Sequence, residues 1–288
     1  MIKKRILVIG GTGMLGHMVY LFLKELNQFE VFNSVYRNKL TEDSYTCNVK
    51  DQNSIFELLN DIQPSIVINC VGALVKESAE TPSSAIYLNA LLPHLLKDLC
   101  NQRNAKLIHI STDCVFSGKK GNYSENDFRD ADDVYGRSKS LGEIFEKPHT
   151  TLRTSIIGPE LKSNGSGLLN WFLTQNETIN GFSNAYWGGV TTLELAKAIE
   201  ICINEELSGL YHVTNGNKIS KYELLHLFKK ETPNKNILIN NYSEYISDKS
   251  LMKSDKYNFN VPSYSQMIEE LFIFMNSNLI HYPNYYGK

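Results

Sequence analysis

Residues 5–16 read Arg-Ile-Leu-Val-Ile-Gly-Gly-Thr-Gly-Met-Leu-Gly, and this stretch decides the fold that the sequence predicts. Its first part is rich in β-branched residues and leucine, which is typical of a buried strand, and an apolar helical pattern follows as far as Leu26. The patterns G-x-G-x-x-G and G-x-x-G-x-x-G both fit the intervening glycines, which are Gly10, Gly11, Gly13 and Gly16. Strand, glycine-rich turn and helix in this order predict a dinucleotide-binding unit.

Each glycine of such a turn has a physical reason. A tight turn takes a positive φ, the backbone must approach a pyrophosphate, and the helix must pack close to its strand. The first amides of the helix then bind the phosphates. The alternative is a plain tight turn. The residues predicted to contact the dinucleotide are Gly10, Gly13, Met14, Leu15 and Gly16.

Strands and helices alternate through the first half of the sequence. Predicted strands lie at 5–9, 29–35, 66–72, 107–110 and 151–153, with a short strand ending at 47–49, and predicted helices lie at 52–62, about 83–103 and about 134–145. Long helices between strands indicate crossover connections and therefore a parallel sheet. The predicted fold class is α/β, with a Rossmann-type doubly wound parallel sheet.

The end of the second strand bears on the choice of dinucleotide. An NAD-specific site usually has a carboxylate there, which binds the adenosine ribose hydroxyls. Residues 33–39 read Asn-Ser-Val-Tyr-Arg-Asn-Lys, without an acid, and the forked guanidinium of Arg37 matches a phosphate dianion. NADPH is therefore the predicted cofactor, with NADH as the alternative if Arg37 is only a solvated surface residue.

Two later strand ends add cofactor candidates. Asn48 and Val49 end the short third strand, where an amide can lie beside the edge of the adenine ring. Cys70, Val71 and Gly72 end the next strand, near the ribose and the phosphates.

Tyr135 and Lys139 are candidates for the chemistry. Residues i and i+4 share one face of a helix, so the phenol and the ammonium can serve one site. A neighbouring cation lowers the pKa of a phenol by favouring the phenolate. The strand at 107–110 ends in Ser111-Thr112-Asp113-Cys114 and brings the Thr112 hydroxyl to the crevice where ligands bind in such sheets. The alternative is a solvated lysine beside a half-buried ring.

Pro93 lies inside the helix predicted at about 83–103. Proline has no amide to bond to the carbonyl of residue i−4, which is Asn89. A freed Asn89 carbonyl can hold a water that passes protons to solvent. The alternative is a packing kink with Asn89 merely buried.

The alternation loosens after residue 158. Predicted helices lie at 168–174, 191–204, 221–230 and 265–275, and a predicted strand at 209–213 can rejoin the sheet. We predict a dinucleotide-binding domain at 1–158, with its sheet completed by about 188–214, and a smaller, interleaved substrate lobe formed by 159–187 and 215–288. The tyrosine-rich tail has no assignment.

Composition and charge exclude several classes of protein. With 29 basic and 31 acidic residues the formal net charge is −2, and no dense basic run appears, so nucleic acid is not an expected partner. The five cysteines lack CxxC spacing, so neither disulfides nor a zinc site are predicted, and a reducing cytoplasm fits best. No run of about 18 uninterrupted apolar residues exists, so no membrane partner is predicted.

The glycine turn, Ser-Thr-Asp, Tyr-x-x-x-Lys and the stretch Leu-Arg-Thr-Ser-Ile-Ile-Gly at 152–158 follow one another in order. With these motifs the sequence resembles an extended short-chain dehydrogenase/reductase. It is most similar to the branch of dTDP-4-dehydrorhamnose reductases and related nucleotide-sugar 4-ketoreductases of bacterial polysaccharide synthesis. The stretches that match this branch are 110–118, 123–125, 134–139 and 142–143. The resemblance is strong to about residue 158 and thin beyond it.

This resemblance implies that a hydride passes from NADPH to the C4 carbonyl of a nucleotide-linked 4-keto-6-deoxy sugar, while Tyr135 protonates the developing alkoxide. Lys139 would hold the nicotinamide ribose and lower the Tyr135 pKa, and Thr112 would bind the carbonyl oxygen. In the superfamily an asparagine carbonyl completes a proton relay, which supports Asn89. A homodimer is compatible with the family, and no ligand cluster justifies predicting a metal.

Two positions depart from the rhamnose enzymes, which usually have an aromatic residue at the place of Cys114 and a tryptophan at the place of Ile156. The sugar can therefore differ from the rhamnose precursor. The predicted substrate-side residues are Thr112, Asp113, Cys114 and Ile156. Cys114 also matches the acid-base cysteine of the GDP-fucose synthase branch, but no histidine at a comparable place pairs with it, which favours a cysteine that only fills space.

Three alternative functions differ in the residues they need. An epimerase/reductase would use Cys114. Dehydratases of this fold have Asp-Glu after the threonine, and Asp113-Cys114 lacks the glutamate. A non-catalytic NADP-binding regulatory subunit would not need Thr112, Tyr135 and Lys139, all of which are intact.

Overall fold

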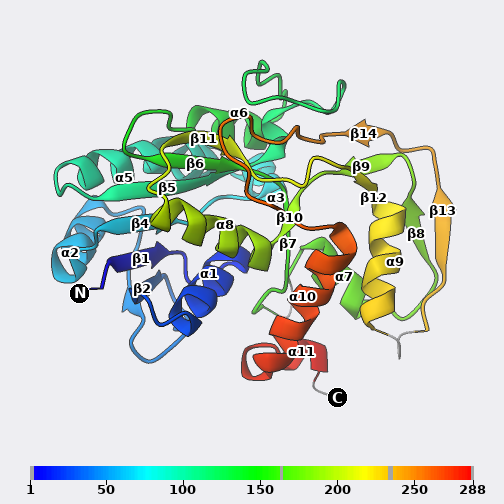
Figure 1. The fold of residues 1–288 in the computed structure, drawn as a ribbon, viewed down its shortest axis with the longest axis horizontal. Helices are drawn as coiled ribbons and strands as arrows, with labels where there is room; N and C mark the ends of the chain where they lie inside the picture. The colour runs from blue at the N-terminus through cyan, green and yellow to red at the C-terminus, as the bar shows by residue number, and fades with distance from the viewer. Residues whose placement is uncertain (1–2, 163–164, 233–235, 287–288) are drawn as a thin grey trace.

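The computed structural model describes residues 3–162, 165–232 and 236–286, and Figure 1 shows them arranged around one large sheet. Its seven strands all pair in parallel. In sheet order the strands are β11 (Gly209–His212), β6 (Thr150–Arg153), β5 (Lys106–Ser111), β4 (Ile66–Asn69), β1 (Arg5–Ile9), β2 (Glu30–Val35) and β3 (Tyr45–Thr46). The predicted parallel α/β sheet is confirmed.

Alternate residues of the central strands pack into two different cores. Ile6 and Val8 of β1 pack with one set of helices, and Leu7 of the same strand packs with the other. Successive side chains of a strand point to opposite faces, so both faces of the sheet are covered. One core holds α1 (Met14–Glu25), α8 (Thr192–Asn204) and α10 (Tyr264–Ser277), and the other holds α2 (Gln52–Ile62) and α5 (Leu92–Asn101). Helices α1 and α8 lie side by side in Figure 1.

Several short helical elements accompany α2 and α5. They are α3 (Val75–Glu80), α4 (Pro82–Ala85), the π-helix η1 (Ile86–Leu91) and α6 (Val134–Leu141). The helix predicted at about 83–103 is therefore α4, η1 and α5 in succession, and only its π-helical section was not expected.

The later part of the chain forms small sheets beside the large one, on the right of Figure 1. They pair β7 (Ile156–Ile157) with β10 (Val190–Thr191), β9 (Ala185–Trp187) with β12 (Ile219–Ser220) and β14 (Ser247–Asp248), and β8 (Ile179–Phe182) with β13 (Ile239–Tyr242). Two helices, α7 (Leu168–Thr174) and α9 (Lys221–Glu231), accompany them. Strand β11 leaves this part and pairs with β6, as predicted.

Three predicted boundaries were wrong by up to about four residues. β4 ends at Asn69 rather than at 72. β3 ends at Thr46, before the predicted end at 47–49. α6 ends at Leu141 rather than near 145, because Gly142 forms its C-cap and glycine is a poor helix former.

The tyrosine-rich tail, which the sequence left unassigned, forms η3 (Leu279–His281) and α11 (Pro283–Tyr286) and packs against α1. The buried His17 of α1 bonds to the Gly13 carbonyl through Nδ1, at 2.7 Å, and to the Tyr282 hydroxyl through Nε2, at 3.1 Å. A carbonyl only accepts, so Nδ1 carries the hydrogen, and the Tyr282 hydroxyl donates to Nε2. Burial lowers the pKa of His17 to about 4, so its ring is neutral.

Candidate active site

The turn between β1 and α1 has the geometry that its glycines require. Gly10 has a φ of +91°, and the N–H groups of Gly10 and Gly11 donate to the Ser34 carbonyl at 3.1 and 2.8 Å. A Cβ on Gly16 would collide with the Gly10 carbonyl. Gly13 begins α1 without a side-chain cap, so within the described residues the first helical amides keep their capacity to bind a phosphate. These features fit the pyrophosphate of a dinucleotide.

Met14 and Leu15 lie in the first turn of α1, and their side chains have different surroundings. Leu15 is buried in the core, so its backbone amide is the group it can offer to a ligand. The Met14 methyl group would lie 2.5 Å from a Cβ on Gly167, which places the Met14 side chain against the start of α7.

The carboxyl end of β4 lies against the glycine turn, because Ile9 of β1 pairs with Asn69 of β4. The Val71 side chain approaches to 2.9 Å from the place of a Gly10 Cβ. A Cβ on Gly72 would lie 3.9 Å from the Lys139 Nζ. The predicted residues Cys70 to Gly72 therefore lie close to both the glycine turn and Lys139, at the carboxyl ends of the strands.

The adenosine-side candidates follow β2 and β3. The Asn48 side chain accepts the Lys50 N–H at 3.1 Å, and the Val49 carbonyl accepts the Tyr87 hydroxyl at 3.1 Å. Arg37 is exposed, with its guanidinium 5.1 Å from the centre of the Tyr36 ring. These three positions stay predictions, since their local contacts are compatible with a ligand or with a plain surface.

Lys139 is buried in α6, and its ammonium donates to the Ile110 carbonyl at 2.6 Å. Burial lowers the pKa of Lys139 to about 8, although the Glu143 and Cys70 groups act to raise it. The side chain is therefore charged at neutral pH, next to Gly72, where a ribose-binding cation would be needed.

The surroundings of Tyr135 shift its pKa in both directions. Burial raises the pKa of Tyr135, the Cys114 and Asp113 groups raise it further, and the Thr112 hydroxyl lowers it. Lys139, whose ammonium donates to the Ile110 carbonyl, is not among the groups that act most on this pKa. That Lys139 lowers the Tyr135 pKa stays a prediction. A phenol with a raised pKa is protonated at neutral pH, which is the form a proton donor needs.

Thr112 precedes the 3-10 turn η2 (Asp113–Val115) at the end of β5. Its hydroxyl donates to Asp113 Oδ1 and accepts the Cys114 N–H, both at 3.1 Å, and it lies near enough to Tyr135 to lower the Tyr135 pKa. Burial raises the pKa of Asp113, and it raises the pKa of the Cys114 thiol to about 12. A thiol with such a pKa is a poor acid-base group at neutral pH, which favours the space-filling interpretation of Cys114.

Asn89 is fully buried, and its side chain bridges the end of β4 and α6. Its amide nitrogen donates to the Ala73 carbonyl and to the Ser138 hydroxyl, both at 3.1 Å, and its oxygen accepts the Ala73 N–H at 2.9 Å. Its backbone carbonyl is covered by Gly142, where a Cβ would collide with it.

That Pro93 frees the Asn89 carbonyl stays a prediction. The preceding η1 is a π-helix, and the Leu92 N–H donates to the Tyr87 carbonyl, five residues back. Pro93 itself lies in α5, and in the α-helical register its missing amide belongs to the Asn89 carbonyl.

A buried ion pair supports the site and was not assigned a role from the sequence. Arg153, at the end of β6, donates to both oxygens of Glu143 at 2.8 and 2.7 Å. Glu143 also accepts the Ser111 hydroxyl at 2.7 Å and an Arg129 N–H at 2.9 Å. Burial acts to raise the pKa of Glu143, but Arg153 holds it below its usual value. The pair ties β6 to the segment after α6 and to the residue before Thr112. The only signal for it was that both residues lie in stretches that matched the family.

Ile156, predicted on the substrate side, lies in β7, pairs with Val190 and packs against the main core. The structure thus brings Thr112, Asp113 and Cys114 together with Tyr135, while Ile156 belongs to a separate two-stranded sheet. Among the described residues, His, Cys, Asp and Glu side chains form no group of three or more that could hold a metal ion. Within the same ranges no helix has the length and apolar character needed to cross a membrane.

Comparison with known proteins adds three findings. A family model described as the RmlD substrate binding domain matches residues 4–268. The dTDP-4-dehydrorhamnose reductase of Aggregatibacter actinomycetemcomitans is 27% identical over 232 residues, which are 76% of each chain. The spore coat polysaccharide biosynthesis protein SpsK of Bacillus subtilis is 30% identical over 237 residues, which are 79% of each chain.

A similar fold is found in the crystal structure of dTDP-4-dehydrorhamnose reductase from Bacillus anthracis in complex with NADP. It has a TM-score of 0.79 and 22% identity, and the match covers 95% of this chain and 100% of that chain.

Proposed function

The chain belongs to the RmlD substrate-binding-domain family, and from this premise we propose that it reduces the C4 carbonyl of a nucleotide-linked 4-keto-6-deoxy sugar with NADPH. The observation that carries the proposal is the close packing of α6 at Gly136, beside Tyr135, against the Cys114 carbonyl, which brings Tyr135 to the segment after Thr112 at the carboxyl end of β5. The relatives named dTDP-4-dehydrorhamnose reductase support the same substrate class. The relative named for spore coat polysaccharide biosynthesis supports a role in surface polysaccharide synthesis.

The chemistry follows from the protonation states of the site. NADPH, when bound, supplies the hydride that adds to the carbonyl carbon. The Tyr135 hydroxyl donates to the carbonyl oxygen, where negative charge develops as the hydride arrives, and the Thr112 hydroxyl donates to the same oxygen when it turns from Asp113 Oδ1. Tyr135 then gives its proton to that oxygen, which completes the alcohol. Because burial raises the Tyr135 pKa, the phenolate left behind is strongly basic and recovers a proton from solvent.

We assign the cofactor to the carboxyl ends of the central strands, beside the glycine turn between β1 and α1. The amides at the start of α1 would bind the pyrophosphate, Lys139 would bind the nicotinamide ribose, and Arg37 would bind the adenosine 2′-phosphate. A solved structure of similar fold contains NADP, which supports the choice of cofactor.

We propose a division of labour between two parts of the chain. Residues 1–158 with 188–214 would bind the dinucleotide, and residues 159–187 with 215–288 would bind the sugar nucleotide. The small sheets formed by β9, β12 and β14 and by β8 and β13 belong to the second part, and β7, β10, β11 and α8 belong to the first.

The setting proposed is the cytoplasm, with a homodimer as the assembly. The five cysteines, all free thiols in the structure, support a reducing compartment. Light scattering of the purified protein tests the assembly, and a monomer mass would overturn the homodimer.

The test of the proposed function is oxidation of NADPH by the purified protein with a panel of nucleotide-linked 4-keto-6-deoxy sugars. One sugar should be turned over. Tyr135→Phe should lower kcat about 1000-fold, because it removes the proton donor, while the Kd for NADPH changes less than about twofold. Tyr222→Phe in α9 is the matched control and should leave kcat unchanged.

Two results would contradict this function. Tight NADPH binding without turnover of any sugar would favour the non-catalytic regulatory alternative. Turnover that persists in Tyr135→Phe would remove Tyr135 from the mechanism.

A further inference from the structure

A segment of the second part of the chain, residues 247–252, crosses the loop that follows Thr112 and η2. We call this segment the strap. It begins with β14 and runs from the small sheets toward α6 and β11 (Figure 1). The strap lies in a polar stretch with neither helical nor strand periodicity, so the sequence pattern predicted no element there.

Backbone hydrogen bonds fasten the strap to the loop at 117–123. The Asp248 N–H donates to the Gly118 carbonyl at 3.1 Å, and the Tyr123 N–H donates to the Ser250 carbonyl at 2.9 Å. The Met252 N–H donates to the Tyr123 carbonyl at 2.8 Å. The residue between the first two contacts is Lys249, whose backbone position is therefore fixed on both sides.

The loop leaves space for the Lys249 side chain. Gly118 has a φ of +84°, and a Cβ on it would lie 3.0 Å from the Lys249 Cγ and 3.4 Å from its Cε. The lysine stem therefore lies directly over a residue that has no side chain. Any larger residue at this position would push the stem away.

The ammonium of Lys249 lies near the candidate active site. The nearby Cys114, Asp113 and Asp133 groups favour its charged form against the effect of burial. Within the part of the chain that the structure describes, it forms no direct ion pair. Cys114 follows Thr112 by two residues, so this cation lies beside the group that would hold the carbonyl oxygen.

We propose that Lys249 is a substrate-binding residue that the second part of the chain supplies, and that its ammonium donates a hydrogen bond to a hydroxyl oxygen of the keto sugar beside the carbonyl. The surroundings favour a hydroxyl over a phosphate, because the two carboxyl groups of Asp113 and Asp133 would repel a diphosphate placed there. An amino group in place of that hydroxyl, charged at neutral pH, is repelled by the ammonium. The inference rests on the proposed function.

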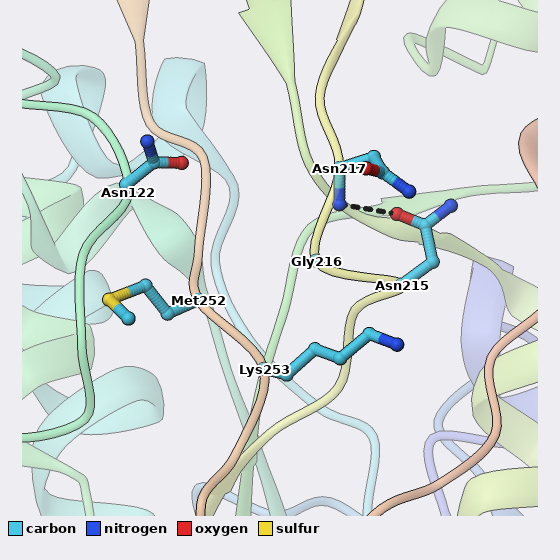
Figure 2. Close-up of a pocket in the computed structure, with 6 residues that line it drawn as sticks. All are labelled: Asn122, Asn215, Gly216, Asn217, Met252 and Lys253. Atoms are coloured by element: carbon cyan, nitrogen blue, oxygen red, sulfur yellow. Dashed lines mark hydrogen bonds between the residues drawn. The ribbon is translucent and has the colours of Figure 1, made fainter.

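The residue that follows the strap, Lys253, offers a different location for the substrate. A polar cavity of about 500 Å³ is lined by Met252 and Lys253 together with Asn122 and residues 215–217. In Figure 2 the Lys253 side chain points toward Asn215 and away from Asn122. Lys253 is exposed, unlike Lys249. A sugar bound in this cavity would depend on Lys253 and not on Lys249.

The experiment compares Lys249→Met, which keeps the length of the side chain and removes its charge, with Lys119→Met and Lys253→Met. The substrate is the nucleotide sugar that the wild-type protein turns over with NADPH. Lys249→Met should raise the KM for the sugar at least tenfold, with kcat changed less than about threefold and the NADPH Kd unchanged. Lys249→Arg should recover part of the loss. Lys119→Met, an exposed lysine in the loop, should match the wild type.

The outcomes separate this inference from the proposed function. An unchanged KM in Lys249→Met, with an active wild type, overturns the inference alone. A raised KM in Lys253→Met with none in Lys249→Met overturns it in favour of the polar cavity. A wild type that neither turns over nor binds any sugar of the panel overturns the proposed function and this inference together. If Lys249→Met is unfolded by circular dichroism, Lys249→Gln is measured in its place.

Discussion

The two sides of the candidate active site are held in different ways. The glycine turn, Thr112 and Tyr135 lie at the ends of regular strands and helices, whose backbone hydrogen bonds repeat along the whole element. Lys249 lies in the strap, which a few bonds fasten to a loop, and one of them joins residues 128 positions apart in the sequence. The cofactor side is therefore part of the sheet itself, while the substrate side is attached to it.

This difference indicates where substitutions can alter one function of the site without the other. A substitution on the strap alters one side chain over the site and leaves the sheet intact, so sugar preference can vary while the cofactor site stays the same. Changes on the first side should affect NADPH or kcat, and changes on the strap should affect the KM for the sugar.

The largest of the remaining effects is expected at Arg37, on the margin of the cofactor side. Arg37→Ala should weaken NADPH binding about 30-fold, because forked hydrogen bonds to a phosphate dianion are lost, and should change NADH binding less than twofold. Fluorescence titration measures both. Arg103→Ala is a matched control, since Arg103 also stacks on an exposed ring, that of Phe56. Equal losses for both dinucleotides would remove Arg37 from the cofactor side.

A smaller effect is expected from the titration of Lys139, which should change kcat/KM for NADPH by up to about tenfold per pH unit. Burial lowers the pKa of Lys139 from 10.5 to about 8, so kcat/KM for NADPH should fall above pH 8 as the ammonium is lost. Stability should respond with the opposite sign. Between about pH 8 and 10.5 the unfolded chain holds the proton that the folded chain has released, so this group's contribution to the free energy of unfolding increases with pH. If the fall in kcat/KM above pH 8 persisted in Lys139→Met, the group that titrates would be one other than Lys139.

The smallest effect is expected at Ser250, which fastens the strap. Its hydroxyl accepts the Asn122 N–H at 2.9 Å and donates to Asp248 Oδ1 at 2.6 Å. Ser250→Ala should lower the free energy of unfolding by about 1 kcal/mol and raise the KM for the sugar about twofold, with NADPH binding unchanged. Thermal and urea unfolding measure the first effect, and the exposed Ser243→Ala is its control. A loss of NADPH affinity instead would mean that the two sides are not independent.

The regular part of the fold was predictable because its signals are local. Helix α2 begins where Asp51 caps it, through its side chain and the Asn53 N–H, and the apolar spacing that follows is complete within eleven residues. The glycine turn and the end of β5 were equally readable, since a positive φ and a strand end are properties of a few adjacent residues.

The rest depended on contacts that a linear pattern does not record. The π-helical register of η1 had no sequence signal, because only the packing of the helix decides that register. The direction of the Tyr135 pKa shift depended on burial and on the Cys114 and Asp113 groups, which the spacing of Tyr135 and Lys139 does not show. Lys249 had no signal at all, because its place is set by the strap and by Gly118, more than a hundred residues earlier.

The bond between His17 and Tyr282 has a consequence for the order in which the protein is made. The glycine turn is synthesised early, but the tyrosine that closes over its helix follows 265 residues later. On the ribosome α1 can pack against β2 as soon as both have emerged, but its buried His17 meets the Tyr282 hydroxyl only after all of residues 4–268, which match the family model, have been made. Until then the Nε2 of this histidine lacks the partner that it has in the folded protein.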